Sequence, residues 1–193
     1  MKNNRFEIRV AGFGGQGVVT IGRVLGVAFT IHEGKNSVNT RSYGPESRGG
    51  ACRSEVVVSE GEIHYPSVRK ADVLVALSQT ALDKYKGDMK EGGILLIDLN
   101  SVKDIPENIV CYGVPAMEIA SAMGSVKYQN SVVLGALSAL LKSMIKKESI
   151  KSAVSENIPP QTIEKNLEAF EKGWEHIVTS VAVTENEKGK IYG

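Results

Sequence analysis

The sequence predicts a three-layer α/β fold of the Rossmann-like type, in which a mostly parallel sheet carries helices on both faces and an inserted β-hairpin. Two observations lead to this prediction. Short apolar runs alternate along the chain with segments of helical periodicity, as in proteins built from βαβ units. The first apolar run leads into the glycine cluster GFGGQG, residues 12–17, which opens directly into an apolar helix.

Length and composition favour one globular domain. The chain has 193 residues, of which 42% are hydrophobic, and these can fill a single core. We expect one domain over residues 1–184 and a flexible tail over residues 185–193. Basic and acidic residues nearly balance, at 23 and 22, which argues against binding to nucleic acid or to a membrane surface. Because no apolar stretch reaches a membrane span and no signal peptide is evident, we expect a cytoplasmic protein.

The first half of the chain predicts a strand over residues 6–12, a helix over residues 16–34, a second strand over residues 36–40 and a hairpin over residues 51–66. Gly22 and Gly26 lie four residues apart on one face of that helix, which would let it pack closely on the sheet. The hairpin should turn at Ser59–Gly61 and end at Pro66.

The second half predicts further strands at residues 71–78, 94–100 and 108–116, and helices at 80–92, 117–124, 130–147 and 163–181. The third of these helices is apolar nearly all round, which indicates that it is buried. Ser149 is expected to cap a short additional helix that stops before Pro159. The last helix carries apolar residues at helical spacing, and its inward face should contain Ile163, Leu167, Phe170, Trp174, Ile177 and Val181.

The glycine cluster is the first candidate site, formed by Gly12, Gly14, Gly15, Gln16 and Gly17. Three of its glycines fit the G-x-G-x-x-G spacing, and the following helix would present free amides to an anion. A dinucleotide site would also need an acidic residue about 20 positions further on, near the end of the second strand. That strand is expected to end in Thr40 and Arg41 without a carboxylate, which favours a tight turn serving another purpose.

The second candidate site is the loop within TRSYGPESRGGACRS, residues 40–54. Its glycines and proline break regular structure, yet it is rich in functional side chains. Loops at the carboxyl ends of parallel strands hold ligands in α/β proteins, so this loop should lie beside the glycine cluster. Either an Arg–Glu pair stiffens an exposed loop, or the loop binds an anionic ligand or a partner subunit. The candidate residues are Arg41, Tyr43, Gly44, Pro45, Glu46, Arg48 and Gly49.

No catalytic or metal-binding residue is expected in this chain. Cys52 and Cys111 lack the C-x-x-C spacing, and two thiolates cannot hold an iron–sulfur cluster alone. The three histidines are scattered, and no Ser/His/Asp or Cys/His grouping suggests a nucleophile. We therefore expect two reduced, partly buried thiols.

Two long motifs in order, GFGGQGVVTIG and SYGPESRGGACRSEV, resemble the gamma subunit of 2-oxoacid:ferredoxin oxidoreductases, the pyruvate/ketoisovalerate oxidoreductase gamma family. The resemblance continues through YPSVRKADVLVALS, through NSVVLGAL from Asn130 and into NLEAFEKGWE. Within the family, the motifs look more like the 2-oxoglutarate branch than the pyruvate branch.

The resemblance implies an enzyme that converts 2-oxoglutarate, coenzyme A and oxidised ferredoxin to succinyl-CoA, CO2 and reduced ferredoxin. It implies thiamine diphosphate, Mg2+ and iron–sulfur clusters on partner alpha and beta subunits, with a delta subunit as a further candidate, and ferredoxin as electron acceptor. The sequence has no GDG motif followed by NN, so the usual thiamine diphosphate and magnesium motif is absent. This chain is then expected to be inactive alone, serving as scaffold and in the coenzyme A path.

Two alternatives remain open. The same subunit could belong to an enzyme for pyruvate or 2-oxoisovalerate. A protein of another class, a self-sufficient NAD(P)-dependent oxidoreductase, would use the glycine cluster and place Arg41 near a 2′-phosphate.

Overall fold

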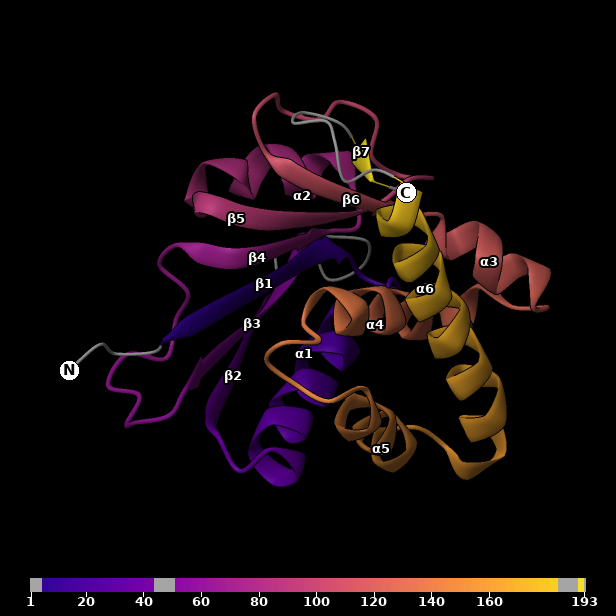
Figure 1. Cartoon of the computed structure of the whole chain (residues 1–193), viewed down its shortest axis with the longest axis horizontal. Helices are drawn as coiled ribbons and strands as arrows, with labels where there is room; N and C mark the ends of the chain where they lie inside the picture. The colour runs from indigo at the N-terminus through magenta and orange to yellow at the C-terminus, as the bar shows by residue number, and fades with distance from the viewer. Residues whose placement is uncertain (1–4, 44–50, 184–190, 193) are drawn as a thin grey trace.

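A computed structural model describes residues 5–43, 51–183 and 191–192, and it forms a three-layer α/β structure (Figure 1). The strands of one seven-stranded sheet are β1 (Phe6–Phe13), β2 (Asn36–Tyr43), β3 (Ala51–Ser59), β4 (Ala71–Ala76), β5 (Met89–Asp98), β6 (Val110–Val114) and β7 (Ile191–Tyr192). The helices are α1 (Val18–Val27), α2 (Gln79–Tyr85), α3 (Ala116–Ala122), α4 (Gln129–Leu140), α5 (Lys147–Asn157) and α6 (Ile163–Val183). A π-helical turn, Ala28–His32, extends α1.

The sheet has the order β2-β3-β1-β4-β5-β6-β7 and is mostly parallel. The pairs from β1 through β4, β5 and β6 to β7 are parallel, whereas β3 is antiparallel to both of its neighbours, β1 and β2. Alternate residues of each strand face opposite layers, so that Val10 packs under α1 and α4 while Ala11 packs under α2. These features confirm the predicted fold class.

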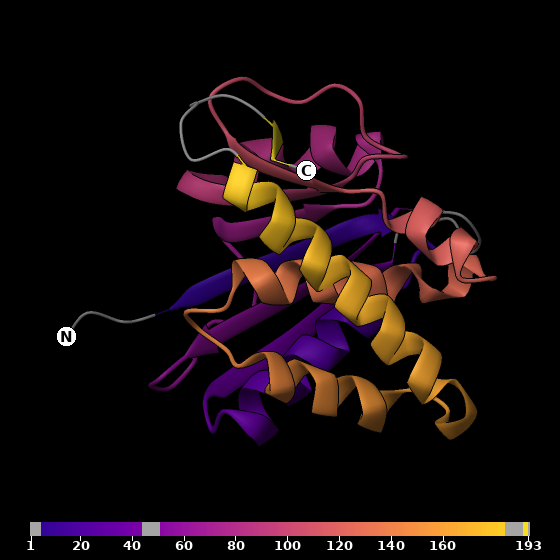
Figure 2. The same ribbon diagram turned by 45° about the vertical axis from the view of Figure 1, so that its right-hand side comes forward.

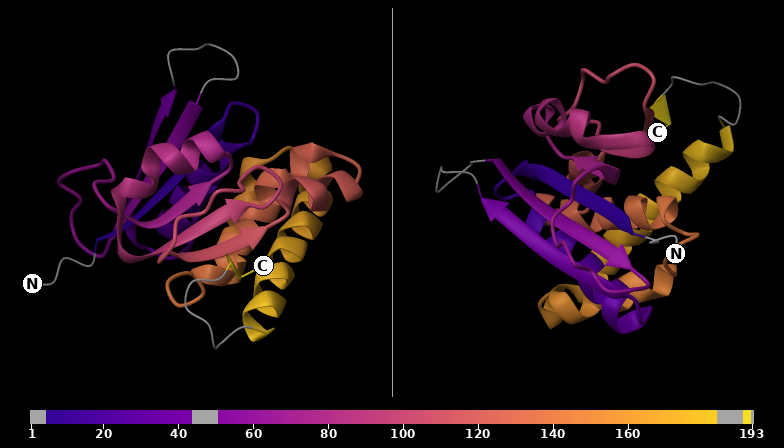
Figure 3. Two further views of the ribbon diagram at one scale, coloured as in Figure 1. Left: turned by 90° about the horizontal axis from the view of Figure 1, so that it is seen from above. Right: turned by 90° about the vertical axis from the view of Figure 1, so that its left-hand side faces the viewer.

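The two helical layers are unequal, as Figures 2 and 3 show. The helices α1, α4, α5 and α6 cover one face and enclose the larger hydrophobic core, whereas α2 covers the other face. Every residue of α4 from Ser131 to Ala139 is buried, which confirms the expectation drawn from its apolar sequence. Phe170 and Ile177 of α6 are buried against it, as the helical spacing predicted.

Glycines allow the closest contacts between helices, and between helix α1 and the sheet. A Cβ atom added to Gly22 of α1 would lie 2.0 Å from Ser54 Oγ of β3, which confirms that this face of the helix rests on the sheet. Where α4 crosses α6, a Cβ atom on Gly135 would lie 1.9 Å from the Phe170 carbonyl oxygen, and one on Gly173 would lie 2.0 Å from that of Val132. The backbones of these helices therefore touch directly.

The prediction of a hairpin over residues 51–66 is wrong, because its first strand pairs with other strands of the sheet. Residues 51–59 form β3, but it pairs with β1 and β2, so no free edge remains for residues 62–65. The segment after β3 is held by side chains instead: the Arg5 guanidinium donates to the carbonyls of Tyr65 and Ser67, at 2.6 and 2.8 Å, and Asn36 Nδ2 donates to that of Gly61 at 3.1 Å.

Three predicted helix boundaries are also wrong. The helix expected over residues 80–92 ends at Tyr85, and β5 begins at Met89 because that residue pairs in parallel with Ala71. The helix expected over residues 130–147 ends at Leu140. Ser149 does not cap α5 but lies in its first turn, where Glu33 accepts from both Ser149 Oγ and the Lys146 amide, at 2.6 and 3.0 Å.

The carboxyl-terminal boundary stays a prediction, because residues 184–190 and 193 lie outside the described residues. Within the expected tail, Ile191–Tyr192 pair with β6 as β7. Among the helices that the structure describes, none combines the length and apolar character needed to cross a membrane.

Candidate functional site

The glycine cluster lies at the carboxyl end of β1, where it turns into α1. Gly12 is buried in the strand, Gly14 and Gly15 are exposed, and Gly17 precedes the first helical residue. Gly15 and Gly17 have φ angles of 100° and 76°, a left-handed conformation that favours glycine. No side chain in the described part of the chain caps α1, and its first turn has no acidic residue, so its amides suit an anion.

The Gln16 side chain spans the carboxyl ends of β1 and β4. Its Oε1 accepts from the Phe13 amide at 2.6 Å, and its Nε2 donates to the Leu77 carbonyl oxygen at 2.7 Å. Because a Cβ atom on Gly12 would lie 2.5 Å from the same Oε1, a glycine there is needed to admit this side chain. Gln16 therefore fills the crevice in which an open α/β sheet would take a ligand.

A second set of contacts fixes α4 against the glycine cluster. A Cβ atom on Gly17 would lie 2.6 Å from the Cβ atom of Asn130, so α4 and the start of α1 approach closely. The preceding residue, Gln129, donates through Nε2 to Asp98 Oδ2 at 3.1 Å. Asp98 is fully buried at the end of β5 and also accepts from Ser101 Oγ and the Ala116 amide, at 2.9 and 3.0 Å. One carboxylate thus joins β5, α3 and α4.

Sequence reasoning did not identify Asp98 as part of the site. The available signal was a single acidic residue closing the apolar run ILLID, at the carboxyl end of a parallel strand. Its hydrogen-bond partners lie 2 to 31 positions further along the chain, which a strand pattern does not reveal.

The second candidate site begins beside the first. Across the sheet, Gly12 pairs with Cys52, and Cys52 pairs with Tyr43. The loop bases are therefore neighbours, although β3 lies between the first two strands of the chain. The expectation that Arg41 and Tyr43 lie in a loop is wrong: both belong to β2, because residues 40–43 pair with β3. Arg41 is exposed on β2, and Tyr43 is its last residue. The remaining candidates lie outside the described residues: Gly44, Pro45, Glu46, Arg48 and Gly49.

A buried charge network lies under α2 and was also missed from sequence. Arg9, only 4% exposed, donates to Glu55 Oε1 at 2.8 Å and to Asp88 Oδ2 at 2.6 Å, and it stacks 4.8 Å from the centre of the Tyr85 ring. Charged residues alternate with apolar ones in FEIRV, and Arg53 and Glu55 lie two positions apart in the next strand, so this spacing was the available signal. The charged groups of this network satisfy one another's hydrogen bonds, so the network joins β1, β3 and the segment after α2.

The two thiols lie on opposite faces of the sheet. Cys52 belongs to the core under α1, and Cys111 to the core under α2. Burial raises the pKa of both thiols, that of Cys111 to about 12, so they remain protonated at neutral pH. Neither is placed to share a metal ion, and the described residues contain no cluster of three or more ligand side chains suited to one.

Comparison with known proteins places most of the chain in one family. The family model for pyruvate ferredoxin/flavodoxin oxidoreductase matches residues 7–176. The 2-oxoglutarate synthase subunit KorC of Methanocaldococcus jannaschii is 48% identical over 175 residues, which cover 89% of this chain and 93% of that protein.

Two solved structures share the fold. The gamma subunit of a keto/oxoacid ferredoxin oxidoreductase from Geobacter sulfurreducens superposes with a TM-score of 0.80 at 38% identity, covering 89% of this chain and 95% of that one. A 2-oxoglutarate:ferredoxin oxidoreductase from Magnetococcus marinus, solved with 2-oxoglutarate, coenzyme A and succinyl-CoA bound, gives 0.82 at 27% identity and covers 99% of this chain. This chain spans 33% of that longer one. The protein therefore belongs to the pyruvate ferredoxin/flavodoxin oxidoreductase family.

Proposed function

We propose that this protein is the gamma subunit of a 2-oxoglutarate:ferredoxin oxidoreductase. The assembled enzyme would convert 2-oxoglutarate, coenzyme A and oxidised ferredoxin to succinyl-CoA, CO2 and reduced ferredoxin. The observation that carries the proposal is the 48% identity to a 2-oxoglutarate synthase subunit of nearly the same length. Enzymes for pyruvate or 2-oxoisovalerate are the second candidate, because the family model itself is named for pyruvate.

The chain's own residues do not fit the redox groups of such an enzyme. The full sequence has two cysteines, and the sheet separates them, whereas an iron–sulfur cluster takes four thiolates. The sequence also lacks the GDG and NN motif for thiamine diphosphate and Mg2+. We assign these groups to partner alpha and beta subunits, or to a delta subunit, with ferredoxin as acceptor. The gamma chain would then be a scaffold that is inactive alone.

The glycine cluster and residues 41–49 are proposed to face those partners and to help receive coenzyme A. Two observations support this role. Gly12, at the base of the first loop, pairs across the sheet with Cys52, at the base of the second. The amino terminus of α1 lacks a side-chain cap among the described residues. An arginine guanidinium has the fork shape that suits a phosphate or carboxylate group, and Arg41 and Arg48 would supply it.

The alternative of an independent NAD(P)-dependent enzyme has less support. Gln16 occupies the crevice between β1 and β4, and the neighbour of β1 on its other side is the antiparallel β3. A dinucleotide-binding fold has a parallel strand there, whose carboxyl end holds the ribose. Arg41 lies on β2, one strand further away.

Assembly with the partner subunits tests the function directly. We expect the chain alone to show no oxoacid oxidation with added thiamine diphosphate and a dye acceptor. Co-expressed with its partners, it should complete a complex whose kcat/KM is highest for 2-oxoglutarate among 2-oxoglutarate, pyruvate and 2-oxoisovalerate. A preference for pyruvate or 2-oxoisovalerate would favour the second candidate, and activity of the isolated chain would refute the scaffold role.

The substitution Arg48→Ala tests the coenzyme path. Loss of a charge-assisted contact typically costs about 1.5–3 kcal/mol, or roughly ten- to hundredfold in binding. The variant should weaken subunit association or raise the KM for coenzyme A, with the melting temperature of the isolated chain nearly unchanged. Arg23→Ala is the matched control, because Arg23 on α1 contacts the Asn157 carbonyl oxygen instead. Normal assembly and an unchanged coenzyme A dependence of Arg48→Ala would indicate a surface Arg–Glu pair.

A further inference from the structure

The glycine turn, residues 13–17, is linked to the rest of the sheet by the side chain of one of its own members, Gln16. Its Oε1 accepts from the Phe13 amide at 2.6 Å, and its Nε2 donates to the Leu77 carbonyl oxygen at 2.7 Å. Within the described part of the chain, no other side chain hydrogen-bonds to residues 13–17. The backbone bond across the turn, from the Gln16 amide to the Phe13 carbonyl oxygen, is longer at 3.2 Å.

Few packing contacts restrain the outer part of this turn. Gly14 and Gly15 are exposed, and a Cβ atom on Gly15 would meet no heavy atom within 4 Å beyond its chain neighbours. Glycine loses more conformational freedom on ordering than any other residue, so a turn of this composition needs a link to keep one shape. The two Gln16 bonds provide that link, because Leu77 directly follows β4 and belongs to the buried core.

We propose that Gln16 is a positioning residue for coenzyme A, whose carboxamide holds the glycine turn in the shape that receives the coenzyme without itself contacting it. The inference rests on the proposed function, and it assigns a role to the one polar side chain of the motif GFGGQG. Both ends of the carboxamide are engaged with backbone groups of the protein. A turn that is already ordered binds its ligand more tightly, because no ordering entropy is lost on binding.

The two bonds require an uncharged group with one acceptor and one donor. The Phe13 amide needs an acceptor and the Leu77 carbonyl oxygen needs a donor, and a carboxamide supplies both. An ionised glutamate would supply acceptors alone and would place a negative oxygen against the Leu77 carbonyl oxygen, whereas a protonated glutamate again has one acceptor and one donor. The position therefore calls for glutamine by its chemistry as well as by its length.

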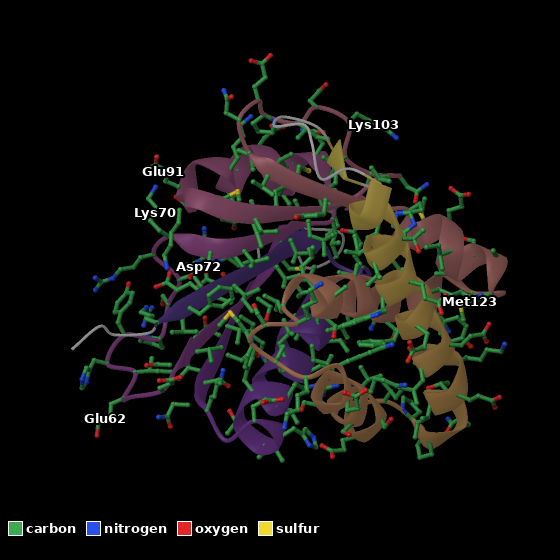
Figure 4. All side chains as sticks on the ribbon, in the orientation of Figure 1. Glu62, Lys70, Asp72, Glu91, Lys103 and Met123 are labelled. Atoms are coloured by element: carbon green, nitrogen blue, oxygen red, sulfur yellow. The ribbon has the colours of Figure 1, made fainter. Side chains whose placement is uncertain are left out.

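Steady-state kinetics of the assembled complex tests this role. Gln16→Met keeps the length of the side chain and loses both hydrogen bonds, so it should raise the KM for coenzyme A about tenfold, with a smaller change in kcat and none in the KM for 2-oxoglutarate. Gln79→Met is the matched control, because Gln79 Oε1 accepts from the amides of Lys103 and Asp104, at 2.9 and 3.0 Å. Figure 4 shows Lys103 on the opposite side of the sheet from α1. An equal rise in the control, or none in Gln16→Met, would overturn the proposal.

The variant Gln16→Glu tests the carboxamide itself. In its ionised form it should raise the KM for coenzyme A as Gln16→Met does, whereas its protonated form can make both hydrogen bonds again. The ratio of its KM to that of the wild-type complex should therefore fall as the pH is lowered from about 8 to about 5, toward the range in which glutamate titrates. A ratio that stays constant over this range would show that the side chain merely fills space, and would overturn the proposal.

Hydrogen exchange of the full chain tests the link without any measurement of activity. The Phe13 amide should exchange about tenfold faster in Gln16→Met than in the wild-type chain, whereas the Ile21 amide, bonded within α1 to the Gly17 carbonyl oxygen at 2.9 Å, should not change. Equal exchange of the Phe13 amide in both proteins would overturn the proposal. A wild-type complex whose turnover is independent of coenzyme A would refute the proposed function and this role together, whereas a dependence that Gln16→Met leaves unaltered would overturn the positioning role alone.

Discussion

A single residue at the start of α1 decides how closely α1 and α4 approach each other. Gly17 adopts a positive φ, and a side chain there would collide with Asn130 of α4. We expect Gly17→Val to destabilise the protein by about 2–4 kcal/mol, since both backbone strain and steric insertion act. Thermal or denaturant unfolding of the isolated chain measures this. Gly61→Val is the control, because that residue has open space around it. Equal stabilities of the two variants would contradict the prediction.

Individual residues also show why the site could be predicted only in part from the sequence. Glycine spacing signals a turn at residues 12–17, and the turn is there. The spacing does not reveal that Gln16 donates to the carbonyl oxygen of Leu77, 61 positions away, or that Asp98 accepts hydrogen bonds from both α3 and α4. Hydrogen bonds of this kind depend on the tertiary arrangement, so a local pattern cannot specify them.

The helix α1 packs closely on the sheet at one glycine rather than two. A Cβ atom on Gly22 would meet Ser54 and Asn39, whereas one on Gly26 would have an ordinary 3.4 Å contact. We expect Gly22→Ala to lower the free energy of unfolding by about 1–3 kcal/mol. Gly26→Ala should leave it unchanged or raise it by up to about 1 kcal/mol, because alanine favours the helix. Chemical denaturation of both variants measures the difference, and matching losses would show that both glycines are contact points.

Elements with strong local patterns were predictable, and those decided by distant partners were not. The apolar spacing of α6 predicts its buried face, on which Phe170 and Ile177 lie. By contrast, the sequence over residues 51–66 suits a hairpin, but β3 pairs with β1 and β2 and leaves no edge for the second strand of that hairpin. Likewise, α5 is capped by Glu33, more than 110 residues earlier, so the local serine was a misleading signal.

Carboxylates held by cations and amide donors make the stability of the molecule depend on pH. Burial alone would raise the pKa of Glu7, but the Arg5 guanidinium and the amides of Arg69 and Lys70 outweigh it and lower that pKa below the usual 4.5. The same balance lowers the pKa of Glu33 and Glu171. Because the unfolded chain then binds more protons, stability is complete above about pH 4.5 and declines as the pH falls through the lowered values.

Denaturant unfolding between pH 3 and 7, about the range that such carboxylates titrate, measures this dependence. We expect Glu7→Gln to be less stable than the parent at pH 7 and to lose less stability on acidification, so that the two curves converge. Curves that run parallel at all pH values would show that Glu7 is not part of the acid response.

The placement of the two thiols bears on how the assembled enzyme would respond to air. A disulfide requires two sulfur atoms to meet, and here a whole β-sheet stands between them. The two thiols therefore cannot be oxidised to a disulfide with each other inside the folded subunit, and a buried, protonated thiol reacts slowly by itself. Oxygen damage to a complex containing this subunit should accordingly reside in other chains. Replacing an air-exposed gamma subunit with a fresh one should restore no lost turnover, whereas the exposed gamma subunit should support full turnover when combined with fresh partners.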